Sequence, residues 1–221
     1  NVSTASAIVA ATGGVKVAKH GNRAISSRCG SADLLFAAGF PTNVAPDGAA
    51  KLLQKTGFTF FFAPNFHQVL KHVSPARKAL GVRTIFNLLG PLANPIKPEL
   101  QLIGVGDAKY VEPMAKAAQR FVTRGLVVHS KDGLDEISPA AVTEGIAIAD
   151  GKTKKFKFDP KKAGIKANLD DLAGGDAAHN LEMLNQLLDG KEDGVLEAVA
   201  ANAGACLWLS EKADDVEDGY K

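Results

Sequence analysis

Apolar segments of strand length alternate along this chain with segments of helical periodicity and with polar loops. Residues 58–62 and 100–105 are strand-like, and residues 46–56 and 177–188 are helix-like. The segment 58–62 is apolar almost throughout, which is typical of a strand covered on both faces of a sheet. The alternation predicts an α/β fold with a mostly parallel central sheet flanked by helices. In such sheets, ligands bind in the loops beyond the carboxyl ends of the strands.

The second half of the chain carries one signal for antiparallel pairing. Residues 142–149 and 153–158 flank Asp150-Gly151, a dipeptide that favours the tight turn of a β-hairpin. A helix is expected over residues 192–209. The acidic segment 214–221 shows neither periodicity, so we expect the chain to end there without a finishing helix or strand.

The composition excludes several classes of protein. A formal net charge of +2 gives no case for a nucleic-acid binder. No apolar run approaches the ~20 residues that span a bilayer, and no signal peptide opens the chain. Cys29 and Cys206 form neither a metal-ligand spacing nor a disulfide framework, and two lone thiols fit a reducing, cytoplasmic location. The lysine-rich segment 152–157 is typical of a solvated strand edge.

The first candidate site is the group of small polar residues at the start of the chain, Asn1 to Thr4, which precedes a predicted helix through Ala11. The free backbone N–H groups and the positive dipole of a helix start bind anions. The same residues are also typical of a plain helix cap, and on local grounds alone that interpretation is the better one.

A denser group of hydrogen-bond donors lies between a predicted strand and a predicted helix. Residues 19–23, with the sequence KHGNR, supply two cations, an imidazole and an amide, and Ser31 follows as the expected helix cap. Lys19 and the nearby arginine can form charge-assisted bonds to phosphate. Gly21 and Gly30 allow the backbone to approach a ligand closely. This density favours a functional site over a plain basic loop, although it does not identify the phosphate ligand.

Three further groups could carry chemistry. Arg77, ten residues after His67, can bind a carboxylate with its bidentate fork, although a lone His or Arg is more often structural. Residues 86–95 combine two prolines, two asparagines and a glycine in a rigid loop, which either covers a ligand or lines the core. Adjacent carboxylates such as Asp135 and Glu136 can hold Mg²⁺ with few protein ligands, but they are also common on solvated surfaces.

Together these motifs resemble those of the anthranilate phosphoribosyltransferase family. The runs at 19–23, 30–33 and 83–95 and the pair Asp135-Glu136 occur in the family's order, and the likeness extends from Asn1 to about Gly204. The resemblance implies that residues 1–221 are the large catalytic α/β domain. The family's N-terminal helical domain, its glycine-rich pyrophosphate loop and its last C-terminal helix are expected to be absent. The chain is therefore expected to be a fragment, with the homodimer formed by the full-length protein.

The resemblance also implies a reaction and a set of site residues. The donor would be 5-phosphoribosyl-1-pyrophosphate bound with Mg²⁺, the acceptor would be the amine of anthranilate, and pyrophosphate would leave, as a step of tryptophan biosynthesis. The implied donor-binding residues are Asn1, Ser3, Thr4, Lys19, Asn22 and Ser31. The implied acceptor-binding residues are His20, Asn22, His67, Arg77, Gly90 and Pro91. The implied metal-binding residues are Ser3, Asp135 and Glu136. No residue is assigned as a general acid or base, because an aromatic amine is already neutral at pH 7.

Two other functions remain as alternatives. A pyrimidine nucleoside phosphorylase shares this type of fold, but its lysine loop usually carries Ser-Gly-Arg where this chain has Gly21-Asn22-Arg23, and it lacks the run at 86–95. A relative without catalysis that binds nucleic acid would have a strongly basic surface and would have lost the metal-binding acids. The net charge of +2 and the presence of Asp135-Glu136 argue against that alternative.

Overall fold

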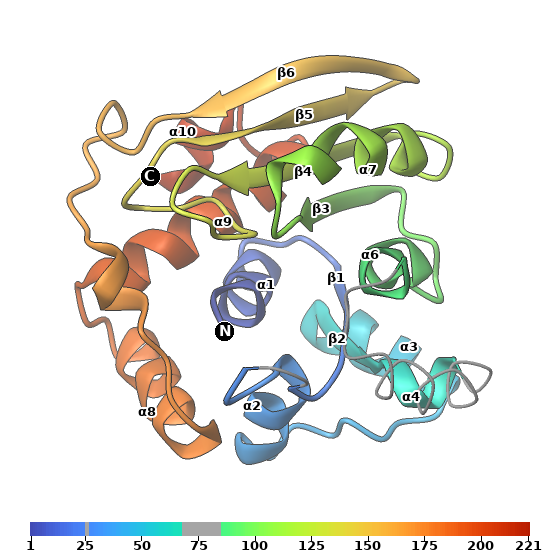
Figure 1. Ribbon diagram of the computed structural model, residues 1–221. Helices are drawn as coiled ribbons and strands as arrows, with labels where there is room; N and C mark the ends of the chain where they lie inside the picture. The colour runs from blue at the N-terminus through green and yellow to red at the C-terminus, as the bar shows by residue number, and fades with distance from the viewer. Residues whose placement is uncertain (25–26, 68–84) are drawn as a thin grey trace.

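The computed structural model describes residues 1–24, 27–67 and 85–221. The α-helices are α1 (Val2–Thr12), α2 (Ser31–Ala37), α3 (Pro46–Thr56), α4 (Ala63–Phe66), α6 (Phe86–Leu89), α7 (Val111–Ala118), α8 (Ala177–Leu188), α9 (Gly194–Leu209) and α10 (Val216–Tyr220). The strands are β1 (Val17–Gly21), β2 (Phe58–Phe62), β3 (Leu100–Gly104), β4 (Arg124–Ser130), β5 (Thr143–Ala149) and β6 (Lys152–Phe158). Short 3-10 helices lie at Gly90–Ala93, Ala108–Tyr110 and Leu169–Leu172. The alternation of strands and helices confirms the predicted α/β class (Figure 1).

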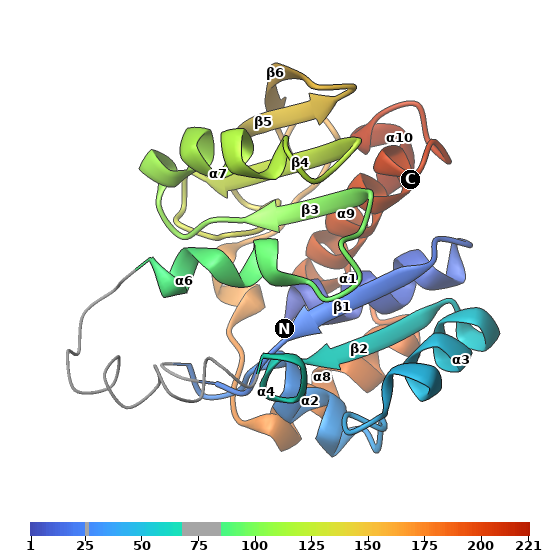
Figure 2. The ribbon, with the colours of Figure 1, turned by 90° about the vertical axis from the view of Figure 1, so that its right-hand side faces the viewer.

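The strands form a parallel pair and a mixed four-stranded sheet. β1 pairs in parallel with β2, and the second sheet has the order β3-β4-β5-β6, in which β3 and β4 are parallel. The antiparallel pairings β4–β5 and β5–β6 involve the predicted hairpin, whose turn has positive φ at Asp150 (49°) and Gly151 (71°). Figure 2 shows β1, β2 and β3 pointing the same way, so their carboxyl ends meet at one edge of the molecule.

Helices cover both faces of the four-stranded sheet. Alternate residues of β4 point to opposite faces. Leu126 and Val128 pack in a cluster with α9, whereas Val127 packs in a cluster with α7. β2 is likewise buried on both sides: Phe60 packs in a cluster with α1 and α2, and its neighbour Thr59 is also fully buried. The apolar residues in the middle of β4 and along most of β2 therefore follow from two-sided burial.

Helix α9 is the central helix of the domain. It packs against α1 and α10 and also contacts β3 and β4. Its small residues allow neighbouring backbones to come very close; a Cβ on Gly204 would lie 2.6 Å from the backbone of Gly219 in α10. The expectation that the chain ends without a helix was wrong, because Asp215 caps α10 by accepting from the N–H of Asp218 and Val216 is buried.

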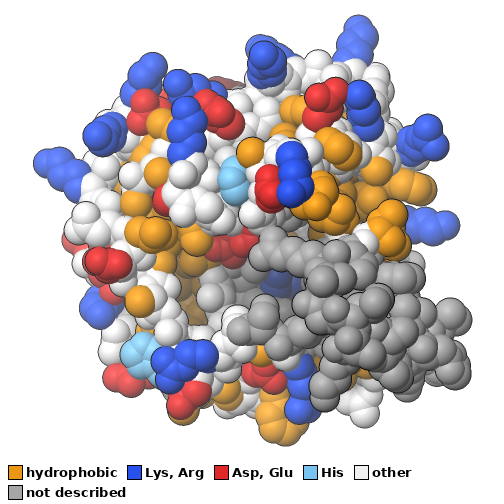
Figure 3. All heavy atoms as spheres, in the orientation of Figure 1, with side chains coloured by type: hydrophobic (Ala, Val, Ile, Leu, Met, Phe, Trp, Pro, Cys, Tyr) orange, Lys and Arg blue, Asp and Glu red, His pale blue; other side chains and the backbone are white. Residues whose placement is uncertain are grey.

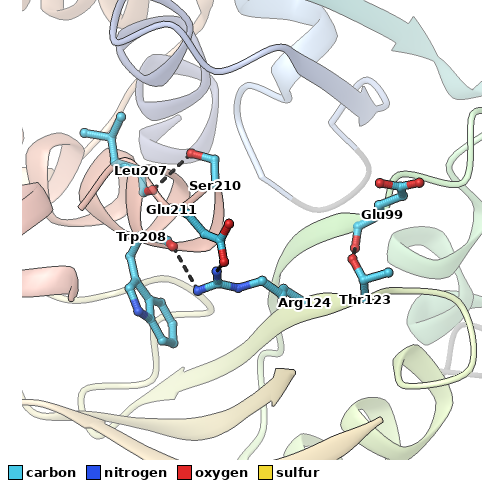
Figure 4. Close-up of polar contacts among 7 residues, drawn as sticks. All are labelled: Glu99, Thr123, Arg124, Leu207, Trp208, Ser210 and Glu211. Atoms are coloured by element: carbon cyan, nitrogen blue, oxygen red, sulfur yellow. Dashed lines mark hydrogen bonds and ion pairs between the residues drawn. The ribbon is translucent and has the colours of Figure 1, made fainter. Parts of the chain in front are cut away.

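Arg124, the first residue of β4, contacts the C-terminal end of α9 (Figure 4). Arg124 donates to the backbone oxygen of Trp208 at 3.2 Å, pairs with Glu211 and lies over the indole ring. A cation at a helix C-terminus is favoured by the helix dipole. In the described part of the chain, no helix has the length and apolar character that crossing a bilayer would require.

Candidate functional site

Three predicted site residues from distant parts of the chain meet at the edge where the parallel strands end. Lys19, on β1, donates from Nζ to Oγ of Ser3 at 3.1 Å. Ser3, in the first turn of α1, donates its backbone N–H to Oε1 of Glu136 at 3.1 Å. Figure 3 looks onto this face and shows acidic side chains at its centre, where the surface is hollowed. The structure therefore brings the predicted phosphate-binding lysine and the predicted metal-binding acids into one cluster.

The charges in this cluster are held in a poorly solvated position. Burial lowers the pKa of Lys19, and the nearby carboxylates of Glu136 and Asp135 oppose that shift. Burial, together with the charge of Asp135, raises the pKa of Glu136, although the N–H of Ser3 favours its ionised form. Both charged groups thus lose hydration in the folded chain, and an anionic ligand on the lysine or a cation on the acids would offset that loss.

The other residues at the start of α1 differ in exposure. Asn1 is exposed and caps the helix with its backbone oxygen, which accepts from the N–H of Thr4 at 3.1 Å. Ser3 is also exposed, but Thr4 is fully buried and its hydroxyl has no hydrogen-bond partner among the described residues. Only Asn1 and Ser3 of the predicted donor-binding residues in this turn therefore present their side chains to solvent.

The loop after β1 folds back onto the start of α2. The backbone oxygen of Asn22 accepts from the N–H of Ala32 at 3.2 Å and from the hydroxyl of Ser31 at 3.4 Å. The side chain of Asn22 is exposed, and its Oδ1 accepts from the next N–H in the chain at 2.8 Å. These contacts place the predicted donor-binding residues Asn22 and Ser31 side by side.

Ser31 is not the cap of α2, contrary to the sequence-based expectation. The helix begins at Ser31, its N-cap is Gly30, and Asp33 Oδ2 accepts from the N–H of Gly30 at 2.9 Å. A Cβ on Gly30 would lie 2.4 Å from the backbone nitrogen of Ala24, and one on Gly21 would lie 2.3 Å from Oγ of Ser31. Both glycines are therefore required for close packing of the loop itself, where the sequence suggested room for a ligand.

Two of the predicted acceptor-binding histidines contact each other. His20 Nδ1 lies 3.3 Å from the backbone oxygen of Gly90, and His20 Nε2 lies 3.1 Å from Nε2 of His67. A carbonyl oxygen only accepts, so Nδ1 of His20 carries a hydrogen; in the neutral ring, Nε2 then accepts from His67. Burial lowers the pKa of His20, and the neighbouring His67 lowers it further, which favours this neutral form.

The segment 86–95 was predicted as a rigid loop, but most of it is helical: α6 is followed directly by the 3-10 helix Gly90–Ala93. This segment is attached to β1. Asn94 is buried and donates from Nδ2 to the backbone oxygen of Ala18 at 2.9 Å, and Gln101 donates to the backbone oxygen of Pro91. This attachment holds Gly90 and Pro91 beside the histidines. Arg77 and the predicted helical segment 75–80 lie outside the described residues.

The donor set at Asp135 and Glu136 suits a hard cation. Asp135 is exposed, Glu136 is half-buried, and the hydroxyl of Ser3 lies in the same cluster. Carboxylate and hydroxyl oxygens are the ligands that Mg²⁺ takes in proteins, usually with waters and substrate phosphates completing its shell.

Comparisons with known proteins match this chain throughout. Residues 1–221 match the glycosyl transferase family, α/β domain. The chain is 44% identical to an anthranilate phosphoribosyltransferase of Clostridium beijerinckii, covering 100% of this chain and 66% of that protein. It is 45% identical to anthranilate phosphoribosyltransferase 2 of Streptomyces coelicolor, covering 100% of this chain and 67% of that protein. The chain thus spans about two thirds of the length of these relatives.

Solved structures give the same result. The crystal structure of anthranilate phosphoribosyltransferase from Thermus thermophilus superposes with a TM-score of 0.91 at 42% identity, covering 100% of this chain and 66% of that one. The enzyme from Saccharomyces cerevisiae in complex with PRPP and Mg superposes with a TM-score of 0.86 at 30% identity, covering 100% of this chain and 63% of that one. A further structure of the Saccharomyces cerevisiae enzyme is in complex with 4-fluoroanthranilate.

Proposed function

The chain belongs to the anthranilate phosphoribosyltransferase family of glycosyl transferases, and on this premise we propose that the protein transfers the phosphoribosyl group of 5-phosphoribosyl-1-pyrophosphate to the amine of anthranilate, in tryptophan biosynthesis. The observation that carries the proposal is the convergence of Ser3, Lys19 and Glu136 at the edge where the strands end. Residues 1–221 serve as the α/β catalytic domain in this proposal, and the full-length protein is a cytoplasmic homodimer.

The donor is bound by cationic and hydrogen-bonding groups from three elements. Lys19 uses one of its three N–H bonds on Ser3, which leaves two for phosphate oxygens. The first turn of α1 adds the positive end of the helix dipole beside Asn1 and Ser3. Asn22 and Ser31, which lie side by side, complete the donor-binding set.

The acids bind the metal that accompanies the donor. Asp135, Glu136 and the hydroxyl of Ser3 would hold Mg²⁺, as suggested by the complex of the Saccharomyces cerevisiae enzyme with PRPP and Mg. When bound, the ion supplies positive charge that stabilises the departing pyrophosphate. The ammonium of Lys19 also stabilises the negative charge of the departing pyrophosphate.

The acceptor lies on the side of the histidine pair and of Gly90 and Pro91, which begin a 3-10 helix. During transfer, the bond from C1 of the ribose to the pyrophosphate oxygen breaks and its electron pair leaves with the pyrophosphate. The lone pair of the anthranilate amine forms the new C1–N bond, and the nitrogen then loses a proton to solvent water. His20 and His67 orient the acceptor with Asn22, and Arg77 binds its carboxylate in this proposal.

Loss of anthranilate fluorescence upon transfer tests the proposed function. The complete protein with saturating donor and Mg²⁺ is expected to consume anthranilate, and Asn22→Ala is expected to slow turnover because it loses contacts to both substrates. Asn185→Ala, an exposed residue of α8, is the matched control and should turn over as the wild type does. No turnover by the complete wild-type protein under these conditions would refute the proposal.

A further inference from the structure

The side chain of Asn202, in the middle of α9, is hydrogen-bonded to the residue that follows the acid pair. Its Oδ1 accepts from the N–H of Ile137 at 3.0 Å, and its Nδ2 donates to the oxygen of Ile137 at 2.8 Å. The second hydrogen of Nδ2 goes to the backbone oxygen of Ala198 at 2.8 Å. Asn202 is 2% exposed, and its amide can accept from one N–H and donate to two carbonyl oxygens here in one orientation only.

The same segment also lies against a glycine of β3. A Cβ on Gly104 would lie 1.5 Å from the backbone oxygen of Asp135, which is far inside any allowed contact. The Asp135–Ile137 backbone is therefore held between β3 and α9. Glu136 sits between these two contacts, with its carboxylate accepting from the N–H of Ser3.

The rest of the β4–β5 loop is held by hydrogen bonds that do not involve Asn202. The N–H of Ser138 donates to Oγ1 of Thr143 at 3.0 Å, and its hydroxyl donates to Asp132 at 2.5 Å. These bonds fix the base of the loop near the strands. Among the described residues, the hydrogen bonds of Asn202 join the acid-bearing backbone to α9, beside the packing of the Ile137 side chain on that helix.

We infer that Asn202 is a positioning residue for the metal site: it fixes the backbone beside Asp135 and Glu136 so that both carboxylates face the same cation. The inference rests on the proposed function for the identity of the ligand, because the pair is taken to bind the cation that accompanies a phosphorylated donor. Replacing a residue that orients metal ligands without touching the metal typically lowers metal affinity 10–100-fold. An amide whose oxygen and both N–H groups are bonded is suited to this role, since turning the amide over would break those bonds.

A second buried asparagine supplies a matched control. Asn180, on α8, is 7% exposed; its Oδ1 accepts from the N–H of Gly175 at 2.8 Å, and its Nδ2 donates to the oxygen of the same residue at 3.3 Å. It therefore clamps a backbone in the same way as Asn202 but outside the loop that carries the acids. Replacing either asparagine leaves a buried backbone N–H and C=O without their side-chain partner, so the two changes perturb folding by the same mechanism.

The experiment measures Mn²⁺ binding to the complete protein without substrates, from the electron paramagnetic resonance signal of free Mn²⁺. Asn202→Ala is expected to weaken Mn²⁺ binding about tenfold or more, and Asn180→Ala to leave it within twofold. The isosteric Asn202→Asp retains the volume of the side chain and is expected to weaken binding as well, because a carboxylate cannot donate to the oxygen of Ile137. Under turnover, the same Asn202 variants should raise the apparent KM for Mg²⁺ and leave the KM for anthranilate unchanged.

A loss of folded protein would lower the apparent kcat without altering either KM, so the two measurements separate positioning from stability. If Asn202→Ala does not fold, Asn202→Asp decides the matter. Wild-type Mn²⁺ affinity in a folded Asn202→Asp protein would overturn the inference, as would an equal loss in Asn180→Ala. Unchanged Mn²⁺ binding after Glu136→Gln would also overturn it. Absence of anthranilate turnover by the wild type would instead refute the proposed function. The Mn²⁺ binding measurement would still test the positioning role of Asn202.

Discussion

Replacement of Lys19 by methionine separates the binding role of this residue from its effect on stability. The ammonium group lies on β1 beside Ser3 and near the carboxylate of Glu136, in a position where burial lowers its pKa. Methionine has a similar length and no charge. Lys19→Met therefore removes the cation and keeps most of the packing of the aliphatic stem.

The substitution is expected to weaken donor binding without lowering the stability of the ligand-free protein. In the absence of donor, one N–H bond of Lys19 goes to Ser3, so two remain for phosphate. Loss of one charged hydrogen bond costs about 1.5–3 kcal/mol, which corresponds to a roughly 10- to 150-fold rise in the Kd for 5-phosphoribosyl-1-pyrophosphate. The stability of the ligand-free protein should not fall, because replacing a poorly hydrated charge by an apolar group removes a desolvation cost.

Isothermal titration calorimetry with the donor and thermal unfolding of the complete protein measure both effects. Lys16→Met is the matched control, because Lys16 is exposed just before β1 and should change neither quantity. A donor Kd within twofold of the wild type in Lys19→Met would refute the assignment of Lys19 to the donor. A large drop in the melting temperature would show that the ammonium stabilises the fold, contrary to the direction of its pKa shift.

Three further changes have defined outcomes. Arg124→Met should lower the free energy of unfolding by about 1 kcal/mol in urea titrations, since the bond to the oxygen of Trp208 at the end of α9 is lost; no change would mean that solvent screens the contact. His67→Asn should raise the pKa of His20 toward 6.5, as followed by NMR, because it removes a neighbour that lowers that pKa. Because the folded pKa of His20 is depressed, wild-type stability should fall as the pH drops below 6.5, and the variant should show a weaker fall. Gly21→Ala should cost about 1–3 kcal/mol of stability through overpacking, and a variant as stable as the wild type would contradict the close approach of the loop.

The sequence was sufficient for features that depend on local periodicity or on residues close together in the chain. The β-hairpin followed from alternating strands around Asp150-Gly151, and both residues have the positive φ that such a turn needs. The strands at 58–62 and 100–105 and the helices at 46–56 and 177–188 were also predicted, because each of these elements carries its own apolar pattern. Helix α10 was missed because five residues are too few to show a helical period, and its one buried apolar residue, Val216, gives no pattern.

The contacts that build the site could not be predicted in the same way. Ser3, Lys19 and Glu136 were each named from local motifs or from the family resemblance, but the hydrogen bond between Ser3 and Glu136 joins residues 133 positions apart. Asn94 and Asn202 were missed as individual anchors because a single buried asparagine has no sequence signature. Their importance lies in which backbone they bond, and that is decided by the packing of helices on the sheet.

Helix α9 links the stability of the domain to the geometry of the candidate site. Asn202 and Trp208 are six residues apart, so about 9 Å of helix separates the amide that holds Ile137 from the carbonyl that Arg124 binds. A rotation of the helix by one residue would turn the amide by roughly 100° and break its bonds to Ile137. The Arg124 contact opposes such a rotation from the far end. Since a side chain outside the site restrains the same helix, Arg124→Met should weaken Mn²⁺ binding if α9 turns as a rigid body, and should leave it unchanged if only the end of the helix frays.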